Sequence, residues 1–532
     1  MRLHKLVFLV AALICSCNTQ KPEPPSPPTP PTPTKPVEKT EGPLKWEESW
    51  DCVKNMGLGW NLGNTLESVS YTDTHSGSDV KYWETYWGQP QASAALMQMF
   101  KNAGFGAIRV PVTWGIHLRP DGSIDPAWLN RVEAVVQYVL NTGMYCILNV
   151  HHDTGADKDA WLVASMKEYE LQKSKYESIW RQIAERFKEY DHKLLFEGYN
   201  EMLDEGRSWC FPTFNKGYNA AMAVDSYKAI NCYAQSFVNV VRSTGGKNAE
   251  RNLIVNTYAA SCGVGDWNDH LREPLTEMIL PEDKYKNHLI FQVHSYPNID
   301  NIVLARIEVE DLCAVLYKNL LSKGAPVIIG EWGHSSEFPS MENRLEFIRY
   351  FVTKVKSYGY GLFHWMGLSD GVARSIPAFS EGECTMVMLN AYHGDNHNVD
   401  LPTLETADYS FKIDFRSLWS EASLCSQNLN TKEYSAIRLQ LDSKPGEGEL
   451  CVKFYGDSEG KTDYAKVSSS DAQYTINETA LGAKITRITL QLHKGDKYSC
   501  VIKRVILIRK DGSEEILCPS SFWGVDVSLL HP

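Results

Sequence analysis

Two glutamates follow apolar stretches of the sequence at positions where a buried strand would end. Glu201 comes after "KLLFEGYN", which begins at Lys193, and Glu331 comes after "PVIIG", which begins at Pro326. A carboxyl group that burial keeps protonated can donate a proton, whereas an ionised one can attack an electrophilic carbon or activate water. Two such groups brought together from distant parts of the chain would therefore support general acid–base or nucleophilic catalysis.

Eight short apolar segments recur between Gly57 and Leu368, with helical stretches between them. Their near-continuous Leu, Ile and Val content is typical of parallel strands buried on both faces. The stretch "WLNRVEAVVQYVLNTG" from Trp128 has the apolar spacing and terminal glycine of a connecting helix. The pattern predicts an α/β fold, a (β/α)8 barrel, with its active site at the carboxyl ends of the strands. The predicted strands begin at Gly57, Ala107, Tyr145, Lys193, Asn252, His288, Pro326 and Gly361.

Glu201 and Glu331 end the fourth and seventh predicted strands, which face each other across the mouth of such a barrel. Two opposed carboxyl groups are what cleavage of a glycosidic bond requires. A separation of about 5 Å gives retention of anomeric configuration through a covalent glycosyl-enzyme, whereas roughly 6.5 Å or more leaves room for water and gives inversion. The residues alone leave this choice open.

Nine further residues at the predicted strand ends are candidates for substrate binding. We expect Arg109 to keep one carboxylate ionised, and His294 and Tyr296 to hydrogen-bond the reacting groups. Trp114 and Trp365 would offer flat apolar faces to a pyranose ring. The nine candidates are Asn61, Arg109, Trp114, His151, His152, Asn200, His294, Tyr296 and Trp365.

The run His151-His152-Asp153, together with His294, suggests a zinc site as an alternative use of these residues. Adjacent strand residues point to opposite faces, so His151 and His152 cannot readily chelate one ion. We therefore expect no metal and no cofactor, and we expect one or both histidines to hydrogen-bond sugar hydroxyls.

Six motifs together resemble the catalytic domain of glycoside hydrolase family 5. They are "GWNLGNTLES" at Gly59, "GFGAIRVPVTW" at Gly104, "LNVHHD" at Leu148, "YNE" at Tyr199, "VHSY" at Val293 and "IIGEWG" at Ile328. With "ETYWGQP" at Glu84, the opening stretches look most like subfamily 4, which is rich in endo-β-1,4-glucanases and xyloglucanases. The resemblance covers roughly residues 45 to 401.

The resemblance implies a retaining mechanism in which Glu201 is the acid/base and Glu331 is the nucleophile. One departure is visible, because Met202 follows Glu201 where the family usually has proline. Because proline is replaced, the loop after Glu201 is expected to follow a different path. Because the carboxylate of Glu201 is retained, we still expect activity.

The start of the chain predicts export. "MRLHKLVFLVAALICSC" pairs a basic beginning with an apolar run too short to span a bilayer, as in a secretory signal. Its end resembles a bacterial lipobox, which would make residues 1–17 a lipoprotein signal and Cys17 the lipidated residue, in the outer membrane or at the cell surface. The alternative is an ordinary signal peptide, a secreted protein and an incidental Cys17. Residues 18–44 are rich in proline and predict an extended spacer.

Composition narrows the choice of partner. The net charge is −12 and the isoelectric point about 5.7, which argues against nucleic acid and against anionic surfaces and suits a neutral polymer. The cysteines contain no CxxC pair, so neither a zinc site nor a dense disulfide framework is indicated. We expect a monomer.

The C-terminal part changes character. Residues 45–403 would form the barrel, and residues 404–532 show short alternating stretches with turns between them, which predicts a small β-sandwich. It resembles a carbohydrate-binding module, and the alternative is a structural spacer with buried aromatics. The candidate platforms are Tyr455, Tyr464, Tyr474, Tyr498 and Trp523.

These observations together predict an endo-acting hydrolase that cleaves internal β-1,4-glucosidic bonds of plant cell-wall glucans, namely cellulose-like chains, mixed-linkage β-glucan or xyloglucan. A β-mannanase or xylanase of the same family is the enzymatic alternative. The alternative from another class is a non-catalytic, glycan-binding surface lipoprotein, against which the presence of both Glu201 and Glu331 argues.

Overall fold

The structure is a computed structural model that describes residues 46–365, 371–395, 397, 399–404, 409–426, 428–446, 449–458 and 460–530. The expected signal, Cys17 and the proline-rich spacer lie outside these residues. Contacts group Trp46–Pro532 into one compact unit. Within the described residues, no helix has the length and apolar character needed to cross a membrane.

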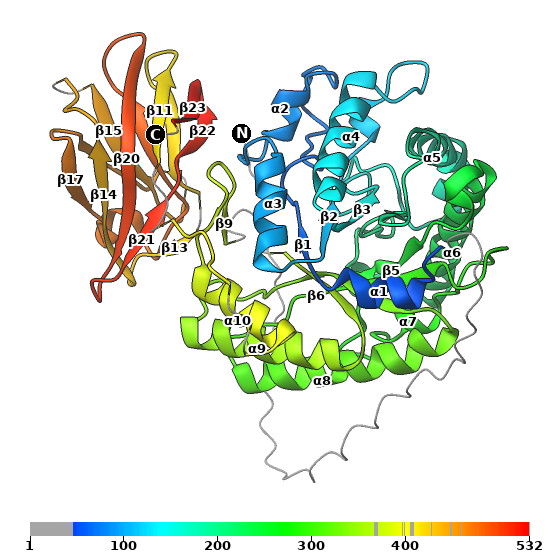
Figure 1. The fold of residues 1–532 in the computed structure, drawn as a ribbon. Helices are drawn as coiled ribbons and strands as arrows, with labels where there is room; N and C mark the ends of the chain where they lie inside the picture. The colour runs from blue at the N-terminus through cyan, green and yellow to red at the C-terminus, as the bar shows by residue number, and fades with distance from the viewer. Residues whose placement is uncertain are drawn as a thin grey trace. The chain divides into compact units, whose positions relative to one another are not determined.

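Eight parallel strands close into a barrel in chain order, with β1 pairing both β2 and β8 (Figure 1). The (β/α)8 barrel predicted from the sequence is therefore confirmed, and each predicted segment contains one strand. The strands are β1 (Leu58–Asn61), β2 (Ala107–Val110), β3 (Tyr145–Asn149), β4 (Leu194–Glu197), β5 (Leu253–Ser261), β6 (Leu289–Ser295), β7 (Val327–Trp332) and β8 (Gly361–His364).

Helices connect the strands and surround the barrel (Figure 1). In the predicted helix after β2, Pro126 occupies the first turn and the Asp125 side chain accepts a hydrogen bond from the backbone N–H of Ala127, which caps the helix. The helices are α1 (Ser49–Met56), α2 (Val80–Glu84), α3 (Ala94–Ala103), α4 (Pro126–Asn141), α5 (Met166–Arg186), α6 (Ala220–Ser243), α7 (Glu273–Thr276), α8 (Ile302–Asn319), α9 (Met341–Ser357) and α10 (Gly382–His393), with short 3-10 turns at Gly115–His117, Phe214–Lys216, Gly246–Ala249 and Leu321–Lys323.

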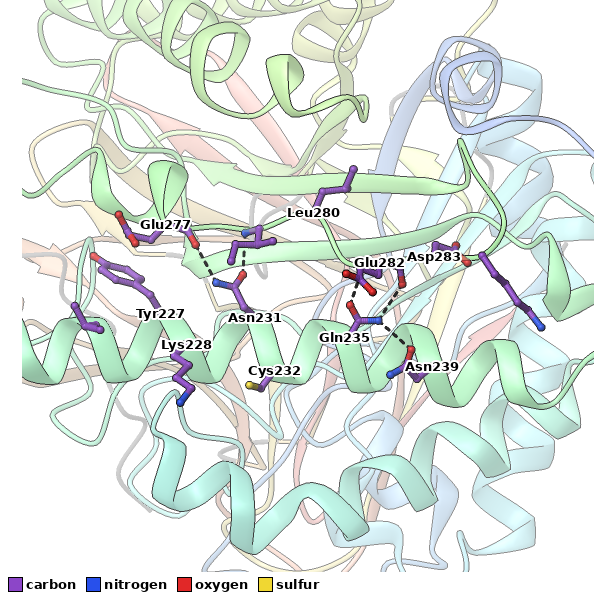
Figure 2. A pocket seen from close by; sticks show the side chains of 13 residues that line it. Tyr227, Lys228, Asn231, Cys232, Gln235, Asn239, Glu277, Leu280, Glu282 and Asp283 are labelled. Atoms are coloured by element: carbon purple, nitrogen blue, oxygen red, sulfur yellow. Dashed lines mark hydrogen bonds between the residues drawn. The ribbon is translucent and has the colours of Figure 1, made fainter.

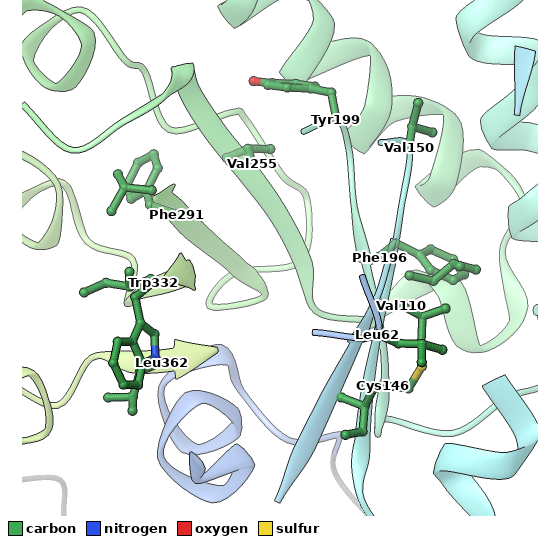
Figure 3. Close-up of a cluster of buried hydrophobic side chains, with 14 of the residues drawn as sticks. Leu62, Val110, Cys146, Val150, Phe196, Tyr199, Val255, Phe291, Trp332 and Leu362 are labelled. Atoms are coloured by element: carbon green, nitrogen blue, oxygen red, sulfur yellow. The ribbon is translucent and has the colours of Figure 1, made fainter. Parts of the chain in front are cut away.

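The main hydrophobic core lies between the strands and the helices (Figure 3). Outward-facing strand residues such as Val110, Phe196 and Phe291 are fully buried in it, together with Trp332 at the end of β7. This layer fixes the rotation of each strand about its axis, because alternate residues must point the opposite way, into the barrel.

The barrel interior is apolar near the amino ends of the strands and polar above. Cys52, Val53 and Met56 of α1 share a cluster with inward residues that include Ile147 and Leu195. Above this cluster, the inward residues of β1 to β6 are polar. This buried polar layer comprises Asn61, Arg109, Asn149, Glu197, Asn256 and Gln292. The apolar plug therefore carries a platform of hydrogen-bonding groups directly beneath the strand ends.

The C-terminal region is built of antiparallel sheets, as predicted. One sheet has the order β17-β14-β20-β11-β23, with β21 beside β20, and a second has the order β16-β15-β19-β12-β22. The strands are β11 (Ser410–Phe415), β12 (Glu421–Cys425), β13 (Leu429–Asn430), β14 (Tyr434–Leu441), β15 (Leu450–Tyr455), β16 (Thr462–Lys466), β17 (Asp471–Thr475), β18 (Lys484–Ile485), β19 (Arg487–Leu492), β20 (Tyr498–Arg509), β21 (Glu514–Leu517), β22 (Ser520–Trp523) and β23 (Val525–Leu530), with helix α11 (Glu478–Leu481).

Side chains of both sheets form one hydrophobic core, with Ile437 and Leu439 from the first sheet and Val452 and Leu490 from the second. A hairpin of β9 (Val372–Ala373) and β10 (Ala378–Phe379) precedes α10 in the chain. The boundary at residues 403/404 stays a prediction.

Candidate active site

The strand ends bring Glu201, His294 and Glu331 together. One carboxylate oxygen of each glutamate and a ring nitrogen of His294 all lie within 4.8 Å of one another. Glu331 is part of β7, whereas Glu201 lies four residues beyond the end of β4. Two carboxyl groups from opposite sides of the barrel therefore meet over the buried polar layer.

Glu201 has the environment of a proton donor. Its Oε1 lies 2.8 Å from Nδ1 of His294, and its side chain keeps 20% of its surface exposed. Burial raises the pKa of Glu201 to about 8; the charge of Glu197 adds to this effect, and Arg109 opposes it. Burial also lowers the pKa of His294 to about 4, so this imidazole is neutral at neutral pH. Glu201 is accordingly protonated there and within reach of a substrate.

Glu331 has the environment of a nucleophile. Its Oε1 accepts a hydrogen bond from Arg109 at 2.7 Å, and its Oε2 accepts one from the hydroxyl of Tyr296 at 2.8 Å. Burial raises the pKa of Glu331 above its usual value, and the positive charge of Arg109 and the hydrogen bond from Tyr296 oppose that rise. Because both oxygens accept hydrogen bonds, the ionised form is the one these partners stabilise.

A third carboxylate lies beneath the other two. Nε and one terminal nitrogen of Arg109 each donate to Glu197 at 2.7 Å, and both side chains are fully buried. Burial alone would raise the pKa of Glu197, but Arg109 and the amide of Asn149 outweigh it and lower that pKa. Glu197 in turn helps to hold the pKa of Arg109 above its usual value. The guanidinium beside Glu331 is thus kept charged and fixed in place.

Amide side chains complete this network. Asn149 donates to Glu197 at 3.1 Å and lies 2.9 Å from Nδ1 of His151, and Asn256 donates to Glu197 at 3.3 Å. The oxygen of Asn200 accepts from Arg109 at 2.8 Å. The candidates Arg109, Asn200 and His151 are therefore linked to one another by hydrogen bonds that involve Glu197 and Asn149, which lie under the strand ends.

Sequence reasoning missed Glu197, Asn149 and Gln292. All three are fully buried members of the polar layer beneath the strand ends. A signal for Glu197 was present, since a charged residue inside the apolar segment "LLFE" needs a buried partner.

His151 and Trp365 form a stacked pair beside the carboxylates. Their ring planes are 1° apart and their centroids 5.6 Å apart, and Nε2 of His151 lies 3.9 Å from Oε1 of Glu331. Burial keeps the pKa of His151 well below its usual value, so the ring is neutral. His152 is half-buried and packs edge-on against Trp87 at 5.2 Å. Trp365 is also half-buried, which leaves part of its ring surface open.

Trp114 corrects one prediction. The side chain is fully buried, and its indole N–H donates to the backbone oxygen of Asn149 at 2.8 Å. It therefore offers no ring face to a sugar, and the predicted stacking role is wrong. Strand β2 ends at Val110, and the chain then turns Trp114 into the core.

Asn61 also differs from its predicted role. It is 2% exposed, its amide N–H donates to the backbone oxygen of Gly330 at 2.9 Å, and its side-chain oxygen accepts from Arg109 at 3.0 Å. With these partners Asn61 positions Arg109 and makes no contact available to substrate.

The residues considered for metal binding have other partners. Asp153 accepts hydrogen bonds from the backbone N–H groups of Trp114 and Gly115 and from the indole of Trp161. Glu201, His294 and Glu331 are close enough to hold an ion. The charged guanidinium that contacts Glu331 would, however, repel a second cation. The donor set thus suits acid–base chemistry better than metal binding.

A wide groove of about 1060 Å³ lies elsewhere, between α6 and the segment 277–284 (Figure 2). The amides of Asn231 and Gln235 hydrogen-bond to the backbone of that segment at 2.8–2.9 Å. None of its lining residues belongs to the carboxylate site. The amides are already used in joining a loop to a helix, and the groove is no rival active site.

Comparison with known proteins agrees with this geometry. The family model described as cellulase (glycosyl hydrolase family 5) matches residues 70–369. A GH5-4 broad specificity endoglucanase from an uncultured bacterium is 47% identical with a TM-score of 0.63, covering 67% of this chain and 98% of that one. A family 5 enzyme from Prevotella bryantii B14, solved with a xyloglucan tetradecasaccharide, is 38% identical with a TM-score of 0.59, covering 66% of this chain and all of that one.

A curated relative is the cellulase/esterase CelE of Acetivibrio thermocellus, 33% identical over 335 residues. The match covers 59% of this chain but only 36% of that protein's length. The similarity is thus to one portion of a longer protein. The motifs, the barrel and the matched family model agree, and the chain belongs to glycoside hydrolase family 5.

Proposed function

We propose that this protein is a retaining endo-β-1,4-glucanase. The observation that carries the proposal is the approach of carboxylate oxygens of Glu201 and Glu331 to within 4.8 Å, in opposite hydrogen-bonding environments. This spacing suits direct attack by one carboxylate, because inverting enzymes need roughly 6.5–9.5 Å to admit water.

In the first step, Glu331 attacks the anomeric carbon while Glu201 gives its proton to the glycosidic oxygen. The bond to the leaving sugar breaks and a glycosyl ester with Glu331 forms. In the second step, Glu201, now ionised, removes a proton from water, and the resulting hydroxide attacks the same carbon and releases Glu331. Two inversions give net retention and restore both carboxyl groups.

Each neighbouring residue has a part in these steps. The hydrogen bonds from Arg109 and Tyr296 orient the attacking carboxylate of Glu331. Because His294 is neutral, it can hydrogen-bond the carboxyl of Glu201 while Glu201 keeps its own proton. The open part of the Trp365 ring provides an apolar surface for a pyranose next to the cleavage point.

The choice of β-glucan rests on the similar proteins. The similar subfamily 4 structure is that of a broad specificity endoglucanase, and another similar family 5 enzyme was solved with a xyloglucan oligosaccharide. We infer that this chain acts on cellulose-like chains, mixed-linkage β-glucan or xyloglucan. β-Mannan and xylan remain the competing substrates in any assay.

The test is release of reducing ends by residues 45–532 from carboxymethylcellulose, mixed-linkage glucan, xyloglucan, glucomannan and xylan. Glu201→Gln and Glu331→Gln should each lower kcat on the best polymer at least roughly 1000-fold, whereas exchange of the exposed Trp50 of α1, the helix packed against the amino ends of the strands, for Ala should leave it unchanged. NMR of the first products should show the β-anomer. An α-anomer, or wild-type turnover by either glutamine variant, would refute the mechanism.

A further inference from the structure

Large aromatic side chains lie exposed on the C-terminal region. Tyr464 is 62% exposed, Trp523 55% and Trp419 49%. The ring of His493 adjoins two of them, with its centroid 5.0 Å from that of Trp419 and 5.9 Å from that of Tyr464. A single exposed ring is ordinary, but a group of rings on one surface is typical of a binding site.

These residues belong to one face of the sheet β16-β15-β19-β12-β22. Val452 and Leu490 point into the hydrophobic core, so the residues that alternate with them point outward. In one outward row Gln491 pairs with Glu421, which pairs with Trp523 at the edge strand. The rings of Tyr464 and Trp523 thus come from the two opposite edge strands, and the polar residues lie between them.

The polar residues between the rings form a connected network. Glu421 accepts the hydroxyl of Tyr455 at 2.6 and 2.7 Å and lies 3.4 Å from the ammonium of Lys453. Gln491 donates to Glu421, and its oxygen lies 2.7 Å from Nε2 of His493. Burial, followed by the charge of Lys453, lowers the pKa of His493, so this ring is neutral and can both donate and accept a hydrogen bond.

The outer face of the opposite sheet, β17-β14-β20-β11-β23, carries ion pairs. Its outward side chains form ion pairs, Arg438 with Asp471 at 2.7 Å and Lys412 with Asp414 at 2.8 Å. Such pairs are what a solvated sheet face ordinarily carries. The aromatic face is therefore not a general property of this region.

We propose that the face formed by Trp419, Tyr464, His493 and Trp523 is a second carbohydrate-binding site, which holds a β-glucan chain. Rings pack against the C–H faces of pyranoses, and the half-buried imidazole of His493, held from beneath by the buried Gln491 and Glu421, is placed to hydrogen-bond a sugar hydroxyl. The charges of Lys453 and Glu421 compensate each other, which suits a neutral chain. Only the choice of β-glucan rests on the function proposed for the barrel.

The face revises the platforms expected from the sequence. Tyr464 and Trp523 are exposed as a platform requires, whereas Tyr474 is only 6% exposed and belongs to the core. Tyr455 is half-buried and donates its hydroxyl to Glu421. Trp419 was overlooked because it precedes β12 and shows no strand alternation.

The test measures binding of residues 45–532 to mixed-linkage glucan and to insoluble cellulose. All proteins carry Glu201→Gln and Trp365→Ala, which remove hydrolysis and weaken binding at the barrel. Adding Trp419→Ala and Tyr464→Ala should raise Kd about tenfold, the usual effect of removing central aromatic contacts. The matched control adds Arg438→Ala and Lys412→Ala on the opposite sheet and should leave Kd unchanged.

A Kd unchanged by the aromatic substitutions would overturn the proposal, as would failure of the background protein to bind either polymer. Thermal melting checks folding, and Trp523→Ala at the other edge strand serves as an independent variant with the same expected direction. Turnover of cellotetraose by the otherwise wild-type Trp419→Ala, Tyr464→Ala protein should match wild type. Failure of the glucanase assay alone would leave the binding result standing, so the two proposals fail separately.

Discussion

Hydrogen-bond partners, more than burial, separate the roles proposed for Glu201 and Glu331. Both carboxyl groups lie in the same buried mouth, where burial raises the pKa of each. Glu331 accepts from a guanidinium and a hydroxyl, whereas the hydrogen-bond partner of Glu201 among the described residues is a neutral imidazole. One site therefore stabilises an ionised carboxylate and the other a protonated carboxyl, as a double displacement requires at its start.

Glu197 should act as a positioning residue and should show itself in the pH profile. Its charge raises the pKa of Glu201, and an acid catalyst loses activity as pH rises through its pKa, here about 8. Glu197→Gln should therefore move the basic limb of kcat/KM to lower pH, by about one unit. It should also lower kcat up to about 100-fold, because Arg109 loses its bidentate partner.

Glu205→Gln is the matched control, since it makes the same exchange at an exposed position of the segment that follows β4. It should leave both the rate and the pH profile as in the wild type. A Glu197→Gln protein that is slower but has an unshifted basic limb would show that the residue only supports the fold.

At the scale of the elements, the sequence predicts the strands better than their rotation. Apolar content located all eight strands, because each must be buried on both faces. The pairing of β6 with β7 shifts between Val293 and His294, and that of β7 with β8 shifts between Ile329 and Trp332. Such bulges re-aim side chains and leave no mark in an apolar pattern. The sequence therefore does not predict which way the side chains of His294 and Glu331 point, although it does predict that both lie at strand ends.

Gly330 allows the bulge in β7 and should not tolerate a side chain. A Cβ there would lie 2.2 Å from the side-chain carbon of Gln292, which is fully buried. Gly330→Ala should destabilise the protein by about 1–3 kcal/mol, measured as a lower melting temperature, and should reduce kcat by displacing Glu331. Combining it with Gln292→Ala should cost less than the two changes added together. Additive losses would show that the close approach of these residues is not the cause.

At the scale of the whole molecule, the proposals describe a chain with two carbohydrate surfaces. The barrel site would bind a single polysaccharide chain at a time. The aromatic face of the sandwich would hold the polymer while the barrel cleaves it. Linking two sites in one chain raises the effective concentration of the second after the first has bound. Removing the aromatic face should therefore lower turnover of polymers more than turnover of cellotetraose.

The N-terminal residues carry the prediction of where this chain works. We propose a lipid anchor at Cys17, followed by a proline-rich spacer whose residues 21–36 would extend roughly 50 Å. Cys17→Ala in the full chain should move the protein from the membrane fraction to the soluble fraction of a bacterial host. Cys15→Ala, two residues earlier in the same apolar setting, should leave it in the membrane. Equal partitioning of the two variants would make Cys17 incidental, because thiol loss at either position would then have the same effect.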